Sequence, residues 1–161
     1  MKGFAAVKRG DYATALREWR PLAEQGDAEA QFSLGVMYRK GWGVPKNDRE
    51  AVKWYRLAAE QGDAKTQNNL GYMYDKGWGV PQNHVEAVKW YRLAAEQGHA
   101  KAQYNLGFMY YNGRGVPESL VHAFAWWNLA AAQGHMDAAK YKDIARNRMT
   151  AEQIAEAQRL R

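Results

Sequence analysis

Residues 27–62 read DAEAQFSLGVMYRKGWGVPKNDREAVKWYRLAAEQG, and residues 63–98 repeat them as DAKTQNNLGYMYDKGWGVPQNHVEAVKWYRLAAEQG. The two copies differ at nine of 36 positions and align without a gap, and a looser third copy fills residues 99–134. A fixed period of this length is typical of stacked structural repeats, because one unit cannot bury its apolar stripe alone. The sequence therefore predicts one domain over 1–161, with an N-terminal half repeat (1–26), three full repeats (27–62, 63–98, 99–134) and C-terminal capping helices (135–161).

Each repeat has the pattern of two helices joined by a turn. The first helix is predicted over 28–40, where Leu34, Met37 and Tyr38 form one apolar stripe at helical spacing. The turn follows at residues 41–45, because its glycines permit positive φ and its proline cannot continue a helix. A second helix then begins after Asn47, a residue type that caps helix N-termini, and ends before Gly62. The fold class is therefore all-α.

Composition excludes several classes of protein. The chain has no cysteine, which excludes disulfide scaffolds, thiolate metal sites and a cysteine nucleophile. Its serines and its four histidines lack the spacing of nucleophile or metal motifs, so we expect no catalytic residue, metal or cofactor. No run of about 18 apolar residues is present, so membrane insertion is not expected.

The repeat pattern Ala-x-x-x-Leu-Gly-x-x-Tyr-x-x-Gly-x-Gly-Val, followed by Ala-x-x-Trp-Tyr-x-x-Ala-Ala, resembles the Sel-one-like repeat (SLR) family, a relative of tetratricopeptide repeats. The first repeat carries it at Ala30, Leu34, Gly35, Tyr38, Gly41, Gly43, Val44, Ala51, Trp54, Tyr55, Ala58 and Ala59. The second repeat departs from it at Thr66. The resemblance implies a right-handed α-α superhelix that acts as a protein-interaction scaffold, with a protein or peptide as its partner and no enzyme activity.

The resemblance also bears on localisation. Members of the family often occur in the bacterial cell envelope, and residues 2–13 look like the segment that follows a cleaved export signal in bacterial members. We therefore expect a periplasmic, envelope or secreted protein, with a cytoplasmic location as the alternative.

The differences between the first two repeats point to a ligand-binding face. Positions 29, 32, 36 and 39 differ and lie on one side of the first helix, away from its apolar stripe. In tetratricopeptide repeats the matching side lines the concave groove. The predicted partner-binding residues are Glu29, Phe32, Val36, Arg39, Lys40, Lys65, Asn68, Tyr72, Asp75, Lys76, Lys101, Tyr104, Phe108, Tyr111 and Asn112. Tyr72, Tyr104 and Phe108 are expected to be the central anchors, and the alternative is a solvated helix surface whose rings pack on the next repeat.

Trp42 and Trp78 form a second candidate surface. Each lies between two glycines in a predicted turn, one period apart. They either form an apolar contact edge or fold over a helix end, and the second interpretation is favoured.

Two other functions stay open as alternatives. Cysteine-rich relatives of the family have been linked to β-lactam binding or hydrolysis, but this chain lacks their cysteines. The net charge of +6 permits weak nucleic-acid binding, yet the cations are not kept in every repeat as a phosphate track requires.

Overall fold

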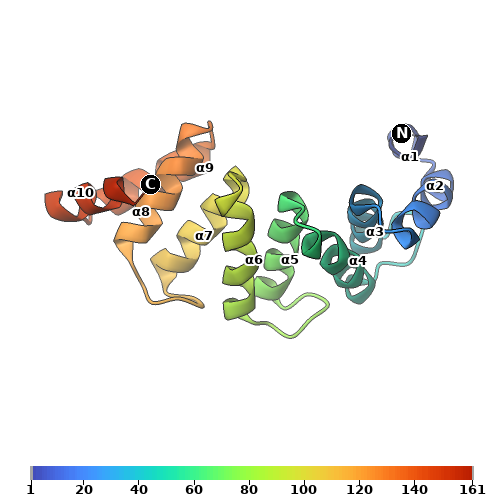
Figure 1. Cartoon of the computed structure of the whole chain (residues 1–161), viewed down its shortest axis with the longest axis horizontal. Coiled ribbons are helices and arrows are strands. Elements are labelled where there is room, and N and C mark those ends of the chain that lie inside the picture. Colours follow the sequence, from blue (N-terminus) through green and yellow to red (C-terminus); the bar gives the residue numbers. More distant parts are fainter. Residues whose placement is uncertain (1, 161) are drawn as a thin grey trace. The chain divides into compact units, whose positions relative to one another are not determined.

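The computed structural model describes residues 2–160, which contain ten α-helices and no strand (Figure 1). The helices are α1 (Lys2–Lys8), α2 (Tyr12–Glu24), α3 (Ala28–Lys40), α4 (Asp48–Glu60), α5 (Ala64–Lys76), α6 (His84–Glu96), α7 (Ala100–Asn112), α8 (Leu120–Ala132), α9 (Met136–Arg146) and α10 (Ala151–Arg159). The predicted all-α fold is confirmed, and the predicted first helix over 28–40 matches α3.

The helices form two compact units, and each is described by itself. The N-terminal unit extends to Gln82 and holds α1 to α5, while the C-terminal unit begins at Asn83 and holds α6 to α10. In the N-terminal unit each helix packs against the next along the chain. In the C-terminal unit α6, α7, α8 and α9 also pack in order, and α10 returns to pack against α8.

Side-chain caps fix where the helices begin. The Asp27 carboxylate accepts a hydrogen bond from the Ala30 amide at 2.9 Å, and the Asn47 side chain accepts one from the Glu50 amide at 3.1 Å. His99 caps α7 through Nδ1, which accepts from the Ala102 amide. These contacts satisfy backbone amides that have no partner within the helix. Because the capping residues recur at the spacing of the repeats, the helices begin at the same spacing.

Helix ends are fixed by glycine. Gly41 and Gly77 each end a first helix with φ of 72°, a left-handed conformation that glycine adopts without a Cβ clash. The following turn then leads into the cap of the next helix. This is the predicted role of the glycine-containing turns.

The two helices of a repeat approach closely because a glycine on the first faces a ring on the second. A Cβ added at Gly35 would lie 2.4 Å from the Tyr55 ring, and one at Gly107 would lie 2.3 Å from Trp127. Small residues opposite rings allow this dense packing. Trp54 and Trp90 are buried at 7% and 5% exposure, as the helical stripe predicts.

Candidate partner-binding surface

The predicted face of the N-terminal unit lies on α3 and α5, and most of its side chains are half-buried. We call it the N-terminal face, and it comprises Glu29, Phe32, Val36, Arg39, Lys40, Lys65, Tyr72, Asp75 and Lys76, of which Lys40 and Lys76 are exposed. The face is built by the 3.6-residue period of each helix, which turns Leu34 and Met37 into the core and these positions away from it.

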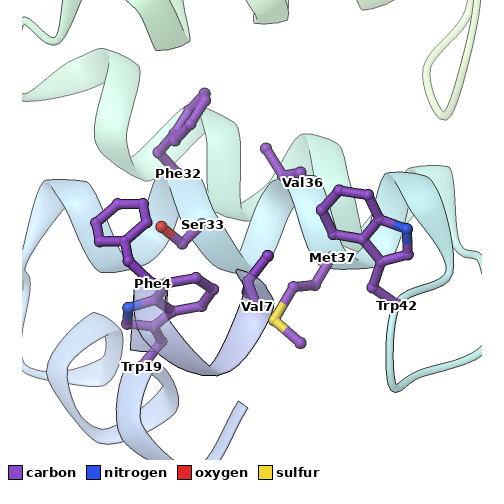
Figure 2. A pocket seen from close by; sticks show the side chains of 8 residues that line it. All are labelled: Phe4, Val7, Trp19, Phe32, Ser33, Val36, Met37 and Trp42. Atoms are coloured by element: carbon purple, nitrogen blue, oxygen red, sulfur yellow. The ribbon is translucent and has the colours of Figure 1, made fainter. Parts of the chain in front are cut away.

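An apolar pocket opens at the α1 end of this face (Figure 2). Its volume is about 100 Å³, and its lining residues are Phe4, Val7, Trp19, Phe32, Ser33, Val36, Met37 and Trp42. Figure 2 shows Phe4 and Trp19 at one end and Trp42 at the other, with Val7, Val36 and Met37 between them. The pocket therefore offers carbon surface to a ligand along nearly its whole length.

A group of cations and rings is formed by residues of α3, of α5 and of the turns that follow these two helices. The Arg39 guanidinium lies 5.9 Å from the centre of the Tyr72 ring and 5.6 Å from that of Trp78. Lys40 lies 6.0 Å from the Trp42 ring, and Lys76 lies 5.5 Å from Tyr72. We call Arg39, Lys40, Lys76, Tyr72 and Trp78 the cationic corner. A cavity of about 370 Å³ beside it is lined by Arg39, Lys40, Lys46, Asp48 and Trp78.

Below this corner lies a buried tyrosine. Tyr55 is 1% exposed, and its hydroxyl lies near Arg39 and Asn69 without a regular hydrogen bond to any described residue. Burial raises the pKa of the Tyr55 phenol to about 12, although the Arg39 charge acts in the opposite direction. The hydroxyl is therefore a neutral group at ordinary pH.

Glu29 and Lys65 neutralise each other at another part of the face. Lys65 Nζ lies 2.7 Å from Glu29 Oε2 and 3.5 Å from Asp63 Oδ1. Partial burial alone would lower the pKa of Lys65, but its two carboxylate partners raise it above the ordinary value. The two charges of this pair neutralise each other. The positive charge of this face that is not paired with a carboxylate lies at the cationic corner.

The C-terminal unit presents a different surface. Tyr104 packs edge-on against Phe108 at 5.0 Å and stacks on His135 at 4.5 Å, and Phe108 packs on Trp127 and Tyr141 at 5.1 and 4.6 Å. Burial raises the pKa of Tyr104, and the nearby Asp137 carboxylate adds to the effect. The faces and edges of these rings are therefore largely covered by contacts with the other rings of the cluster.

The remaining predicted residues of this unit lie at the ends of α7. The Tyr111 hydroxyl accepts a hydrogen bond from Arg148 Nη1 at 2.9 Å, while Lys101 and Asn112 are exposed. The unit thus has exposed polar positions on both sides of its ring cluster.

One of the predicted contact residues, Asn68, is buried. At 5% exposure it cannot belong to an open surface. The same repeat position carries Phe32 and Tyr104, which are half-buried. Rings of that length extend to the surface, whereas the short amide side chain does not.

The two predicted edge tryptophans differ. Trp42 is half-buried and stacks on Tyr12, with 5.3 Å between ring centres and 10° between planes. Trp78 is 41% exposed and packs edge-on against Tyr72 at 5.5 Å. Trp42 therefore folds over a neighbouring helix, and only Trp78 offers an open ring.

Sequence reasoning missed Phe4 and Val7. Residues 2–8 (KGFAAVK) correspond to residues 34–40 (LGVMYRK), but at a separation of 32 residues instead of 36. The structure supports this register, since Gly3 packs on Trp19 as Gly35 packs on Tyr55. The turn after α1 is four residues shorter, and this shift hid Phe4 from a search at the fixed period.

Within residues 2–160, no cluster of three or more histidine, aspartate or glutamate side chains is placed to hold a metal ion. Over the same part of the chain, every helix is too short or too polar to cross a bilayer.

Comparison with known proteins gives a consistent result. A family model described as Sel1 repeat matches residues 28–63, 64–99 and 100–135, one residue later than the predicted repeat boundaries. Among curated proteins there is no match. A Sel1 repeat protein from Oxalobacter formigenes is similar to this chain with TM-score 0.84 and 41% identity, over 89% of this chain and 59% of its own.

A second solved structure is similar as well. It is a protective antigen present in uropathogenic Escherichia coli strains, displaying an SLR fold, with TM-score 0.76 and 44% identity over 77% of this chain. The chain spans 59% of the length of the first protein and 27% of the second. Both structures support the repeat fold and come from bacterial proteins.

Proposed function

Because the chain belongs to the Sel1 repeat family, we propose that it is a non-catalytic scaffold that holds an extended segment of a partner protein on its first-helix faces. Sel1 repeat proteins are generally protein-interaction scaffolds and are typically without catalytic activity. We further propose that the partner lies against the first helix of each repeat.

One observation carries this placement. Helices α3 and α5 bury the same residue types at 34, 37, 70 and 73, yet carry unlike side chains at 29, 32, 36 and 39 and their counterparts. Half-buried rings and long cations at those positions offer large contact area at small entropic cost, which is typical of binding surfaces. Phe32, Val36, Arg39 and Tyr72 are the residues that we expect to contact the partner in the N-terminal unit.

The proposal extends to location. We place the protein in the bacterial cell envelope, because one similar structure is that of a protective antigen of uropathogenic Escherichia coli. Fractionation of the source cells, followed by detection with a specific antibody, tests this placement.

Site-specific photocrosslinking tests the binding face. A photoreactive phenylalanine analogue at position 72 is expected to form an adduct with a discrete partner in living cells. The same analogue at Leu57, which is 41% exposed on the second helix α4, is the matched control. Equal adducts from both positions, or adducts from position 57 alone, would contradict the proposed face.

A further inference from the structure

We propose that the N-terminal face binds an acidic peptide segment: one aliphatic side chain fills the Phe4–Trp42 pocket, and a carboxylate nearby in the segment pairs with Arg39 and Lys40. The inference rests on the proposed function and names the chemistry of the segment that this unit accepts. Its evidence is a pocket, a set of cations without acidic partners, and the spacing between them.

The pocket fits a single branched aliphatic side chain. An apolar cavity of about 150 Å³ can hold benzene, so the volume of about 100 Å³ suits a leucine, isoleucine or valine side chain better than an indole. Ser33 supplies the only side-chain oxygen among its lining residues. That hydroxyl already donates to the Glu29 backbone carbonyl at 2.9 Å. The indole nitrogens of Trp19 and Trp42 are the other polar side-chain atoms of the lining, and Trp19 Nε1 has no hydrogen-bond partner among the described residues. The lining therefore offers two N–H donors but is otherwise carbon surface, which favours an aliphatic guest.

The cationic corner lacks acidic partners. In the described part of the chain, the ion pairs of this unit join Lys46 to Asp48 and Lys65 to Glu29 and Asp63. Arg39, Lys40 and Lys76 instead lie over aromatic rings, and none of them forms an ion pair within residues 2–160. Rings hold a guanidinium in place without neutralising it, and an arginine so placed can bind a carboxylate through two parallel hydrogen bonds.

The local charge balance also favours an acidic ligand. The cavity beside the corner is lined by the cations Arg39, Lys40 and Lys46 and by the single carboxylate of Asp48, which leaves an excess of two positive charges. Asp48 is already paired with Lys46 at 3.1 Å. The neutral Tyr55 hydroxyl beneath Arg39 adds no negative charge to the corner.

Pocket and corner both include residues of α3, and this shared helix sets the spacing of the ligand. Val36 lines the pocket, and Arg39 and Lys40 follow one helical turn later, or about 5.4 Å along the axis. Phe32 lies about two turns from Arg39. An extended peptide advances about 3.3 Å per residue, so the aliphatic residue and the acid should be about two to three positions apart.

A random decapeptide library displayed on phage tests the inference against the whole chain. We expect enrichment of peptides that contain leucine, isoleucine or valine two or three positions from aspartate or glutamate. Binding of a selected peptide should weaken as salt is raised, because one ionic contact contributes to it.

Three variants assign the two halves of the site. Arg39→Gln should weaken a selected peptide by about tenfold, the loss typical of one charge-assisted contact. Lys53→Gln removes the same charge from an exposed position on α4 and should leave binding unchanged. Val36→Phe, which fills the pocket, should abolish the aliphatic preference while the acidic preference remains. The circular-dichroism spectrum and melting curve of each variant confirm that it is folded.

The outcomes separate this inference from the proposed function. Enriched peptides without acidic residues, or binding unaffected by Arg39→Gln, would overturn the inference and leave the scaffold function standing. Failure to enrich any peptide, together with equal crosslinking from positions 72 and 57, would overturn both. Self-association in analytical ultracentrifugation that is lost in Val36→Phe would assign the pocket to a second copy of the chain and also overturn the inference.

Discussion

At the scale of single residues, the buried polar groups are the features that the repeat pattern hides. Arg20 donates to the Tyr38 hydroxyl at 2.8 Å, and Arg92 donates to the Tyr110 hydroxyl at the same distance, each across 18 residues of sequence. The Tyr55 hydroxyl, by contrast, is buried and has no regular hydrogen bond to a described residue. The hydroxyls of Tyr38 and Tyr110 are thus each bonded to an arginine of the helix that precedes them.

This difference predicts the effect of removing each hydroxyl. Tyr38→Phe should lower the free energy of unfolding by about 1 kcal/mol, because it leaves Arg20 without its acceptor. Tyr55→Phe should change it by less than about 0.5 kcal/mol, since no regular hydrogen bond is lost. Urea denaturation at pH 7 measures both values. A larger loss for Tyr55→Phe than for Tyr38→Phe would show that the Tyr55 hydroxyl is bonded in solution.

The raised pKa of Tyr55 predicts a specific alkaline instability. Its phenol ionises near the ordinary pKa of 10 when the chain is unfolded and at about 12 when it is folded. The folded state therefore holds the proton longer, so this contribution to stability is complete below pH 10 and is lost as pH rises from 10 to 12.

Urea denaturation at pH 9 and pH 11 measures that loss. Between these two pH values the wild type should lose about 1 kcal/mol more stability than Tyr55→Phe. Tyr38→Phe, which also lacks one tyrosine hydroxyl, serves as the comparison. Equal losses in wild type and Tyr55→Phe would contradict the assignment.

At the scale of helices, contact between glycine and an aromatic ring sets how closely two helices pack. Gly35 on α3 and Gly107 on α7 lie against Tyr55 and Trp127, and Gly3 on α1 lies against Trp19. A glycine inside a helix costs about 1 kcal/mol relative to alanine. Its presence at equivalent positions is explained by the ring that occupies the space of the missing Cβ.

Gly35→Ala should therefore destabilise the protein although alanine is the better helix former. A Cβ at Gly35 would lie 2.4 Å from the Tyr55 ring, so we expect a loss of about 1–3 kcal/mol, as for other overpacked cores. Gly62→Ala is a useful comparison, since its added Cβ would meet nothing within 4 Å and its cost comes from a φ of 95° alone. Thermal denaturation followed by circular dichroism gives both values. A gain in stability for Gly35→Ala would contradict the close-packing explanation.

At the scale of the whole molecule, two units made from one repeat pattern present different surfaces. Val36 and Phe4 line an open pocket in the N-terminal unit, whereas the ring of Phe108, at the same repeat position, packs against Trp127 and Tyr141 in the C-terminal unit. The three anchors predicted from sequence are therefore not equivalent. Tyr72 belongs to a corner with free cations, and Tyr104 and Phe108 belong to a ring cluster.

Stability measurements should separate the anchors. Replacement of both Tyr104 and Phe108 by alanine should lower the free energy of unfolding by about 2–4 kcal/mol, because each ring is half-buried among others. Tyr72→Ala should cost about 1 kcal/mol or less, since its main contacts are the exposed Trp78 ring and the two cations Arg39 and Lys76. Chemical denaturation of the two variants provides the comparison. If the loss of stability per ring removed were the same in the two variants, the contacts within the ring cluster would contribute no more to stability than the contacts of Tyr72.

The repeat alone determined the helices, their caps and the buried stripe. Asp27, Asn47 and Gly41 fix helix ends through local contacts within a few residues, and local contacts can be read directly from sequence. The same period correctly placed Phe32, Val36 and Arg39 on one side of α3, because helical geometry has a fixed angle per residue.

Tertiary structure decided what each of those side chains touches. The burial of Asn68, the stacking of Trp42 on Tyr12 and the pocket at Phe4 all depend on residues distant in sequence or on a turn four residues shorter than its counterparts. The repeat period determines on which side of a helix a residue lies. The length of the side chain and the residues around it determine what that side chain contacts. For that reason the sequence located the proposed binding face on the first helices, and only the packed molecule distinguished an open pocket from a filled one.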